Sequence, residues 1–451
     1  MWIINGRIFT MVGPVIENGY VKIENGTVAE IGAMEQISVP KTGEKQGDAI
    51  QGDTIQEDAI QGDAIQEDTT QGDAIQRDAI QGNTIQEENI CEKDIRGKDI
   101  RKKDMHDEEI LDVQGAWVLP GLIEAHAHIG LTEEKSGAIG DDCNEQTNPV
   151  LPGLRGLDAV NPMDPAFHDA IQAGITSVMT GPGSANVVGG QFVFMKTHGR
   201  CVDQMIVKSP AAMKIAFGEN PKTVYGDQNM CPGTRMGTAY LLRKELFRAV
   251  QYMEKRESGE LEEKDFDLEP WIPVLKKEIP MKAHAHRTDD ILTAIRIAKE
   301  FDLDITLDHC TEGHLITEEI AASGFPVIAG TDLTSRSKVE VEYMSFKTAG
   351  ILVDAGIKVA VTTDHPVALI QYLPICAGYS VKYGMSMEEG LKALTINPAQ
   401  ICRVDDRVGS LEVGKDADIA VFDGNPMEVF THTLYTIVDG EIVYRQGDEE
   451  R

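Results

Sequence analysis

Hydrophobic and polar residues alternate at both ends of the chain. Residues 2–34 alternate and contain Asn-Gly pairs, and residues 418–424 and 435–444 repeat the pattern near the C-terminus. Alternation with a period of two is typical of half-buried strands, and Asn-Gly is a common turn between paired strands. We therefore expect the two ends of the chain to form one small β-sandwich domain.

The pattern changes in the middle of the chain to helices followed by short apolar strands. Residues 164–174 predict a helix that Asp164 caps, with proline in its first turn and glycine at its end, and residues 175–180 predict a buried strand. Similar helix–strand pairs recur at 288–300 with 303–309, 317–323 with 325–330, and 345–356 with 357–364. Such repeats imply a parallel sheet, and about eight strands fit a closed barrel. The expected fold is α/β: a (β/α)8 TIM-like barrel beside the small β-sandwich domain.

Residues 46–105 follow neither pattern, because they repeat five-residue units such as Gln-Gly-Asp-Ala-Ile. A period of five could suit a four-sided β-helix, but that fold would bury unpaired aspartates. We expect a disordered acidic insertion, with a solenoid as the alternative. The expected division of the chain is 1–45 and 106–119 for the first part of the β-sandwich domain, 46–105 for the insertion, 120–397 for the barrel and 398–451 for the rest of the β-sandwich domain.

Charge and cysteine content narrow the class of protein. The chain has 42 basic and 74 acidic residues, and its net charge of −32 disfavours nucleic acid, anionic membranes and strongly anionic substrates as partners. No signal peptide pattern and no membrane-spanning apolar run is visible in the sequence. Seven scattered cysteines without a Cys-x-x-Cys pair favour reduced thiols. We expect a cytoplasmic protein that acts on a small molecule. It could also form a homo-oligomer.

Imidazoles stand at the ends of several predicted strands. The string Gly121-Leu-Ile-Glu-Ala-His-Ala-His128 ends in two histidines that point to the same side of a strand. Later strands end in further histidines and in an aspartate. Because catalytic residues of barrels gather at the carboxyl ends of strands, these groups predict a divalent-metal site. Any one of them could instead cap a loop. The set is His126, His128, His284, His286, His309 and Asp364.

This ordered set resembles the amidohydrolase superfamily, most closely its imidazolonepropionase-like branch. Two strings carry the resemblance. The first opens at Pro120-Gly-Leu-Ile, and the second is Val408-Gly-Ser-Leu-Glu-Val-Gly-Lys-Asp-Ala-Asp-Ile-Ala-Val. The resemblance covers the chain except for the insertion. It implies that His126 and His128 hold one metal and that His284 and His309 hold a second. It also implies that Asp364 binds metal and moves protons, so Asp364 and His309 are the expected catalytic residues.

Two residues of a middle strand are candidates for a bridging ligand. Lys214 is similar to the carboxylated lysine of prolidase-like relatives, and Glu219 lies at a strand end, where its carboxylate could bind metal directly. Lys214 is the favoured ligand, and the site holds one metal if neither binds. Zinc is the expected ion, one or two per chain, while imidazole and carboxylate ligands leave manganese, iron and cobalt open.

The resemblance implies hydrolysis of a C–N bond in an amide, a cyclic amide or a dipeptide. A divalent metal lowers the pKa of bound water to roughly 7 and polarises the carbonyl, and Asp364 can return the proton to the leaving nitrogen. The alternatives are a prolidase-like dipeptidase, a heterocycle deaminase and a non-catalytic scaffold. Arg287 disfavours the deaminase, because it stands where such deaminases carry glutamate.

Further residues are expected near the barrel mouth. Arg235 and Tyr225 lie in a loop-rich stretch where Arg235 could pair with a substrate carboxylate, and His314 and His365 lie close to strand ends. These four are the expected substrate contacts, although each could equally have no role. Residues 181–190 are expected to form a loop at the mouth, and Cys310 is expected to be a buried structural thiol.

Overall fold

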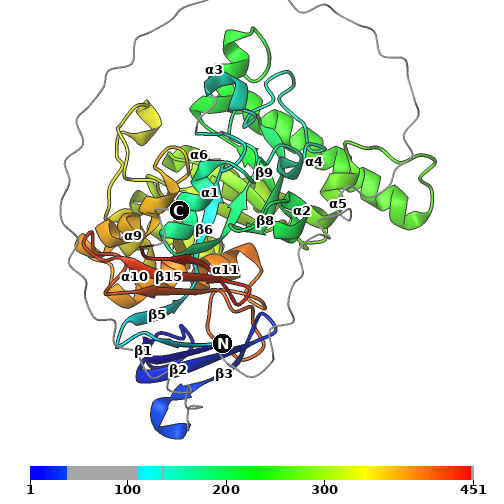
Figure 1. The fold of residues 1–451 in the computed structure, drawn as a ribbon. Helices are drawn as coiled ribbons and strands as arrows, with labels where there is room; N and C mark the ends of the chain where they lie inside the picture. Colours follow the sequence, from blue (N-terminus) through cyan, green and yellow to red (C-terminus); the bar gives the residue numbers. More distant parts are fainter. Residues whose placement is uncertain (38–108, 135–136, 448–451) are drawn as a thin grey trace, which may run out of the picture. The chain divides into compact units, whose positions relative to one another are not determined.

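The described part of this computed structural model comprises residues 1–37, 109–134 and 137–447, so the pentad insertion lies outside it. The described residues form two eight-stranded sheets (Figure 1). The first sheet has the order β16-β15-β14-β5-β1-β2-β3, with β4 paired to β1, so it joins strands from both ends of the chain. Its strands are β1 (Trp2–Ile8), β2 (Ile16–Glu24), β3 (Thr27–Ala33), β4 (Ile110–Asp112), β5 (Trp117–Pro120), β14 (Ile419–Phe422), β15 (Thr433–Val438) and β16 (Glu441–Arg445). The sandwich architecture and the domain boundaries stay predictions.

Only one of the three Asn-Gly pairs near the N-terminus makes a turn. Asn25 and Gly26 join β2 to β3 with φ angles of 51° and 79°, as a tight hairpin turn requires. The pair at 5–6 lies inside β1, where the register with β2 shifts on both sides of Gly6. The pair at 18–19 lies inside β2. The expectation of turns at these two pairs was wrong, because a strand bulge also suits glycine.

The second sheet is nearly closed and fits the expected TIM-like barrel. Its strands follow one another in sequence order from β6 to β13. The ring is completed by contacts such as the hydrogen bond that Thr362 Oγ1, just after β13, donates to His126 O on β6 at 2.7 Å. The strands are β6 (Leu122–Ala127), β7 (Ile175–Thr180), β8 (Val188–Lys196), β9 (Ile206–Ala216), β10 (Met281–Ala285), β11 (Ile305–His309), β12 (Val327–Ala329) and β13 (Val359–Val361).

One strand breaks the expected alternation. Strand β8 runs antiparallel to both β7 and β9, so the three neighbouring strands form a meander, with only the four-residue α2 between β8 and β9. A wholly parallel barrel was therefore a wrong expectation. Of the loop expected at 181–190, the last three residues already belong to β8. An apolar run shows that a strand is buried but not in which direction it runs.

Helices cover the outside of the barrel. The helix expected at 164–174 is α1, and Asp164 caps it by accepting a hydrogen bond from Ala166 N at 3.2 Å. The helices are α1 (Pro165–Gln172), α2 (Val202–Met205), α3 (Glu219–Asp227), α4 (Arg235–Ser258), α5 (Ile272–Leu275), α6 (Thr288–Glu300), α7 (Thr317–Ser323), α8 (Thr348–Asp354), α9 (Leu373–Lys382), α10 (Met387–Leu394) and α11 (Ile396–Cys402). Short 3-10 turns are η1 (Met34–Gln36), η3 (Gly137–Gly140), η4 (Gly156–Asp158), η5 (Glu269–Trp271), η6 (Gly313–Leu315), η7 (Val339–Val341) and η8 (Ile370–Tyr372). None of the described helices is both long and apolar enough to cross a bilayer.

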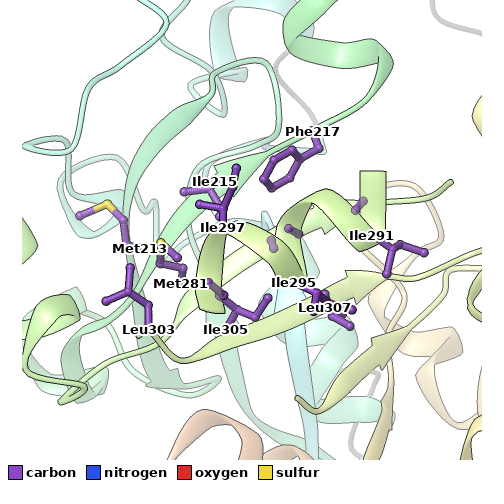
Figure 2. Close-up of a cluster of buried hydrophobic side chains, with 14 of the residues drawn as sticks. Met213, Ile215, Phe217, Met281, Ile291, Ile295, Ile297, Leu303, Ile305 and Leu307 are labelled. Atoms are coloured by element: carbon purple, nitrogen blue, oxygen red, sulfur yellow. The ribbon is translucent and has the colours of Figure 1, made fainter. Parts of the chain in front are cut away.

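Helix α6 shows how the barrel wall is held. Its buried positions include Ile291, Ala294, Ile295 and Ala298, spaced three and four residues apart on one helical face. Figure 2 shows this face against apolar side chains of β9, β10 and β11. Burying a large aliphatic side chain contributes about 1.5–3 kcal/mol. The packing thus fixes the strands whose ends carry the histidines.

The apolar run at 116–123 belongs to two sheets rather than to one strand. Its first part is β5 in the terminal sheet, and its second part begins β6 in the barrel. The chain changes sheets at Gly121, where a Cβ would lie 2.1 Å from Thr176 Oγ1. Only glycine permits that approach, which explains why a glycine precedes the first histidine string.

A buried ion cluster ties the barrel to the terminal sheet. Lys196, the last residue of β8, has its Nζ 2.9 Å from Asp416 Oδ2, 2.7 Å from Asp418 Oδ2 and 3.1 Å from Asp439 Oδ1. Its side chain is 4% exposed, and that of Asp418 is 3% exposed. Asp416 and Asp418 belong to the closing string of the sequence, so these residues have a structural role.

Candidate metal centre

The two histidines of the first barrel strand present one ring nitrogen each to the same point. His126 Nδ1 lies 2.8 Å from Asp308 Oδ2, and His128 Nδ1 lies 2.7 Å from Gly181 O. Because a carboxylate and a carbonyl can only accept, both Nδ1 atoms carry the proton. When the ring is neutral, its Nε2 is left with a lone pair, the state in which imidazole binds a metal.

Asp364 faces both lone pairs. Its Oδ1 lies 3.6 Å from His126 Nε2 and 3.3 Å from His128 Nε2, is buried, and receives no hydrogen bond of good geometry from any described residue. Burial acts to raise the pKa of Asp364, but the surrounding imidazoles, His309 first, hold it below the usual range, so the carboxylate is ionised. When both rings are neutral, an anionic oxygen facing two lone pairs favours a cation between them. These side chains therefore fit a divalent metal.

A proton competes with a metal ion for this place. Burial acts to lower the pKa of His128, but Cys143 and Asp364 outweigh burial and raise it to about 10. Metal binding must then displace a proton, which links metal affinity to pH.

The other three imidazoles continue the same cluster. The ligand atoms of His284, His286 and His309 lie within 4.8 Å of one another, and those of His126, His309 and Asp364 do so as well. His309 belongs to both groups, and its Nδ1 lies 2.7 Å from Gly330 O, so its Nε2 is free to bind. Burial lowers the pKa of each of these four histidines below the ordinary value, which keeps the rings neutral.

Of the two candidates for a bridging ligand, Lys214 lies among the histidines and Glu219 does not. Lys214 is fully buried on β9, and its Nζ lies 3.1 Å from His126 Nε2, inside the cluster. Burial lowers its pKa to about 8. Glu219 begins α3, and its Oε1 accepts a hydrogen bond from Glu340 N at 3.1 Å. The structure thus brings Lys214 to the histidines and holds the Glu219 side chain against η7.

Buried charges beneath the ligands were missed by sequence reasoning. Glu124 accepts hydrogen bonds from Thr362 Oγ1 at 2.6 Å and from Thr363 N at 2.8 Å, and so joins β6 to the segment that carries Asp364. Asp308, which orients His126, also lies 3.3 Å from the buried Lys282 Nζ. A signal was present for Glu124, because it precedes His126 by two residues on the same strand face.

Two of the expected substrate contacts are engaged elsewhere in the fold. Tyr225 lies in α3 rather than in a loop, is fully buried, and donates a hydrogen bond to Asn186 Oδ1 at 2.7 Å. Arg235 is the first residue of α4, and its Nε lies 3.1 and 3.0 Å from the two carboxylate oxygens of Asp290. The expected loop spans residues 228–234, while Tyr225 and Arg235 at its two ends lie on α3 and α4.

The remaining two contacts lie near strand ends as expected. His314 Nδ1 lies 3.0 Å from Thr348 Oγ1. His365 is fully buried, its Nδ1 accepts a hydrogen bond from Ile370 N at 3.2 Å, and burial lowers its pKa to about 4. Cys310 is also fully buried, and burial raises the pKa of its thiol, as a structural role predicts.

The family of the chain follows from its similarity to known proteins. An amidohydrolase family pattern matches residues 301–444. The crystal structure of an amidohydrolase from Thermotoga maritima MSB8 matches 99% of this chain and 100% of that chain, with a TM-score of 0.81 and 36% sequence identity. The chain belongs to the amidohydrolase family. This amidohydrolase is imidazolonepropionase-like and acts as a hydrolase on carbon–nitrogen bonds.

More distant similarities carry different names. The imidazolonepropionase of Fusobacterium nucleatum subsp. nucleatum is 26% identical over 377 residues, which cover 75% of this chain and 85% of that protein. Amidohydrolase tasK of Hapsidospora irregularis is 27% identical over 362 residues, or 74% of this chain, which spans only 37% of the length of tasK. A prolidase bound to N-methylphosphonate-L-proline has a TM-score of 0.52 at 14% identity, which shows the fold alone.

Proposed function

We propose that this amidohydrolase cleaves an amide or cyclic amide bond of a small molecule with water and uses divalent metal as its cofactor. His126, His128 and Asp364 would hold one ion, His284 and His309 would hold a second, and zinc is the expected metal. The observation that carries the proposal is the convergence of two imidazole Nε2 atoms on the ionised Asp364 Oδ1, at 3.6 and 3.3 Å.

Lys214 would bridge the two ions as a carbamate. A neutral amine adds to carbon dioxide, forms an N–C bond and loses a proton, and the lowered pKa of about 8 makes that amine available near neutral pH. The product carries two oxygens and a negative charge beside His126, where an ammonium group would repel bound cations. Glu219 drops out of the proposed ligands, because its carboxylate accepts the backbone hydrogen bond from η7.

The protein's own groups account for the proton transfer. When bound, a divalent ion lowers the pKa of its water and polarises a carbonyl oxygen. The ionised carboxylate of Asp364 accepts the proton of the attacking water as the O–C bond forms. It then donates that proton to the leaving nitrogen as the C–N bond breaks. His309 lies beside that carboxylate, with its Nδ1 3.9 Å from Asp364 Oδ2, and its Nε2 faces the ligand cluster.

The other activities considered for this sequence have less support from the site. A prolidase-like dipeptidase needs a cation for the substrate carboxylate, and Arg235 is already paired with Asp290. A deaminase of this fold carries glutamate three residues after the strand histidine, where Arg287 stands here and pairs with Asp289 at 3.1 Å. A scaffold role is disfavoured because the chain brings two groups of candidate ligands together.

Metal analysis combined with a substrate screen tests the proposal. Protein purified without chelator is assayed for bound metal and is then screened against N-acyl amino acids, cyclic ureides and dipeptides, with amine and ammonia release measured separately. We expect bound metal, hydrolysis of an amide or ureide, and little release of ammonia from heterocycles. The Asp364→Asn variant should lose at least about a hundredfold in turnover because it cannot accept the proton.

The exposed His168 on α1 offers a control, because His168→Asn should leave turnover unchanged. Metal-free protein, or metal-loaded protein that deaminates heterocycles but cleaves no amide, would refute the proposed function.

A further inference from the structure

We propose that Lys282 is a positioning residue for the first metal position. It acts by holding Asp308 against His126, so that the imidazole keeps the orientation in which its Nε2 faces Asp364 Oδ1 at 3.6 Å. The proposal rests on the proposed function, because it concerns a ligand of the same site. It goes beyond that function, because Lys282 is not itself a ligand.

The side chain of Lys282 crosses the interior of the barrel. The residue lies on β10, and β10 and β6 are four places apart in the nearly closed sheet of eight strands, so the two strands face each other. Lys282 Nζ donates a hydrogen bond to Ala125 O on β6 at 3.1 Å. Because Ala125 directly precedes His126, the ammonium group binds the backbone that carries this ligand.

The same ammonium group contacts the carboxylate that lies against the His126 ring. Lys282 Nζ is 3.3 Å from Asp308 Oδ2, and that oxygen is 2.8 Å from His126 Nδ1. The other oxygen, Oδ1, accepts a hydrogen bond from Thr306 Oγ1 at 2.6 Å. Asp308 is therefore held on one side by a hydroxyl group and on the other by a positive charge.

Charge rather than aligned hydrogen bonding fixes the Oδ2 atom of Asp308. This oxygen is buried and has no hydrogen bond of good geometry to any described residue. Its place therefore depends on attraction to the ammonium group of Lys282 and to the ring N–H of His126. Such attraction is strong here because Lys282 and Asp308 are both fully buried, away from the screening effect of water.

A purely structural role is the alternative for this ion pair. Replacing a buried ion pair by apolar side chains of similar volume is often neutral for stability or even stabilising, so burial of the pair is weak evidence that it holds the fold together. Both contacts of the Lys282 ammonium group lie next to His126, one on the backbone before it and one on the carboxylate beside its ring. This placement favours a role in the metal site.

A double-mutant cycle of zinc affinity tests the proposal. Wild type, Lys282→Met, Asp308→Asn and the double variant are stripped of metal, and the affinity for each equivalent of Zn²⁺ is measured by competition with a chelator. We expect Lys282→Met to bind one equivalent about 10- to 100-fold more weakly, with the other equivalent unchanged. Because Lys282 acts through Asp308, the double variant should lose no more affinity than Asp308→Asn alone.

Two results would overturn this role of Lys282. One is a pair of losses that add up in the double variant, because Lys282 then acts independently of Asp308. The other is a Lys282→Met protein that is folded by circular dichroism and binds both equivalents as tightly as wild type. The matched control is Lys208→Met on β9, whose Nζ donates to Arg403 O at 3.3 Å, and this variant should keep wild-type affinity for both equivalents.

Failure of this inference is distinguishable from failure of the proposed function. Wild type that binds no zinc would refute both, whereas wild type that binds zinc but cleaves no amide would refute the function and leave the cycle to decide the role of Lys282. If Lys282→Met alone does not fold, the double variant still decides, because it removes both buried charges. Zinc binding weaker than that of Asp308→Asn would then overturn the inference.

Discussion

Replacing Lys196 by methionine should destabilise the protein strongly without changing the ligand cluster. The change removes the ammonium that lies 2.7 Å from Asp418 Oδ2 and leaves that oxygen with Ser177 Oγ at 3.4 Å. Asp416 keeps Arg407 at 2.7 Å, and Asp439 is 53% exposed and stays hydrated. The buried charge that loses its partner is therefore that of Asp418. Leaving one buried charge uncompensated costs about 3–5 kcal/mol, and the partners that remain favour the lower end.

Urea unfolding followed by tryptophan fluorescence measures this change, since Trp2 and Trp117 lie in the terminal sheet. Adding Asp418→Asn to Lys196→Met removes the uncompensated charge, so the double variant should recover about 2 kcal/mol of the free energy of unfolding.

The effect of Lys196→Met should also depend on pH. Burial already raises the pKa of Asp418, and loss of the lysine raises it further. Because the folded state then holds the proton more tightly than the unfolded chain, stability falls as pH rises through the folded pKa. The deficit should thus be larger at pH 8 than at pH 5. A single variant that loses less than about 1 kcal/mol, or a double variant no more stable than the single one, would refute the reasoning.

Three further predictions concern the site and the insertion. Because the pKa of His128 is about 10, the affinity for Zn²⁺ should rise about tenfold per pH unit between pH 6 and 9, as measured by competition with a chelator. An affinity that does not change with pH would contradict the idea that a proton and the metal compete for His128. With a pKa of about 8, Lys214 is neutral in about a tenth of molecules at pH 7, so reconstitution with ¹³C-bicarbonate and zinc should speed up about tenfold from pH 6 to 7. A carbamate signal that persists in Lys214→Met would rule out Lys214 as the carboxylated residue. Deleting residues 46–105 should leave turnover intact, and a soluble deletion variant with much lower turnover would show that the insertion matters.

Local signals predicted much of this molecule. The cap at Asp164 and the apolar faces of α1 and α6 can be read from consecutive residues, because hydrogen bonds and side-chain stripes of helices are local. The rule that barrel strands end at the active site was enough to bring His126, His309 and Asp364 to one place. The repeat of helix and strand along the chain predicts a barrel, because such units imply a parallel sheet.

The errors come from interactions that join distant parts of the chain. Arg235 pairs with Asp290, 55 residues away, and no local pattern announces that pairing. The backbone of Glu219 likewise donates to Glu340, 121 residues further along the chain. The direction of β8 is set by its partners β7 and β9 and not by its own composition.

Two proposed ligands stand on backbone that side chains rarely adopt. His309 has a φ of 70° and Asp364 a φ of 52°, and such left-handed geometry costs a residue other than glycine roughly 1–2 kcal/mol. Glycine at either position would relax the fold while abolishing the chemistry. Lineages released from selection for turnover should therefore drift toward glycine at 309 and 364, and would gain thermal resistance as they lose their catalytic power.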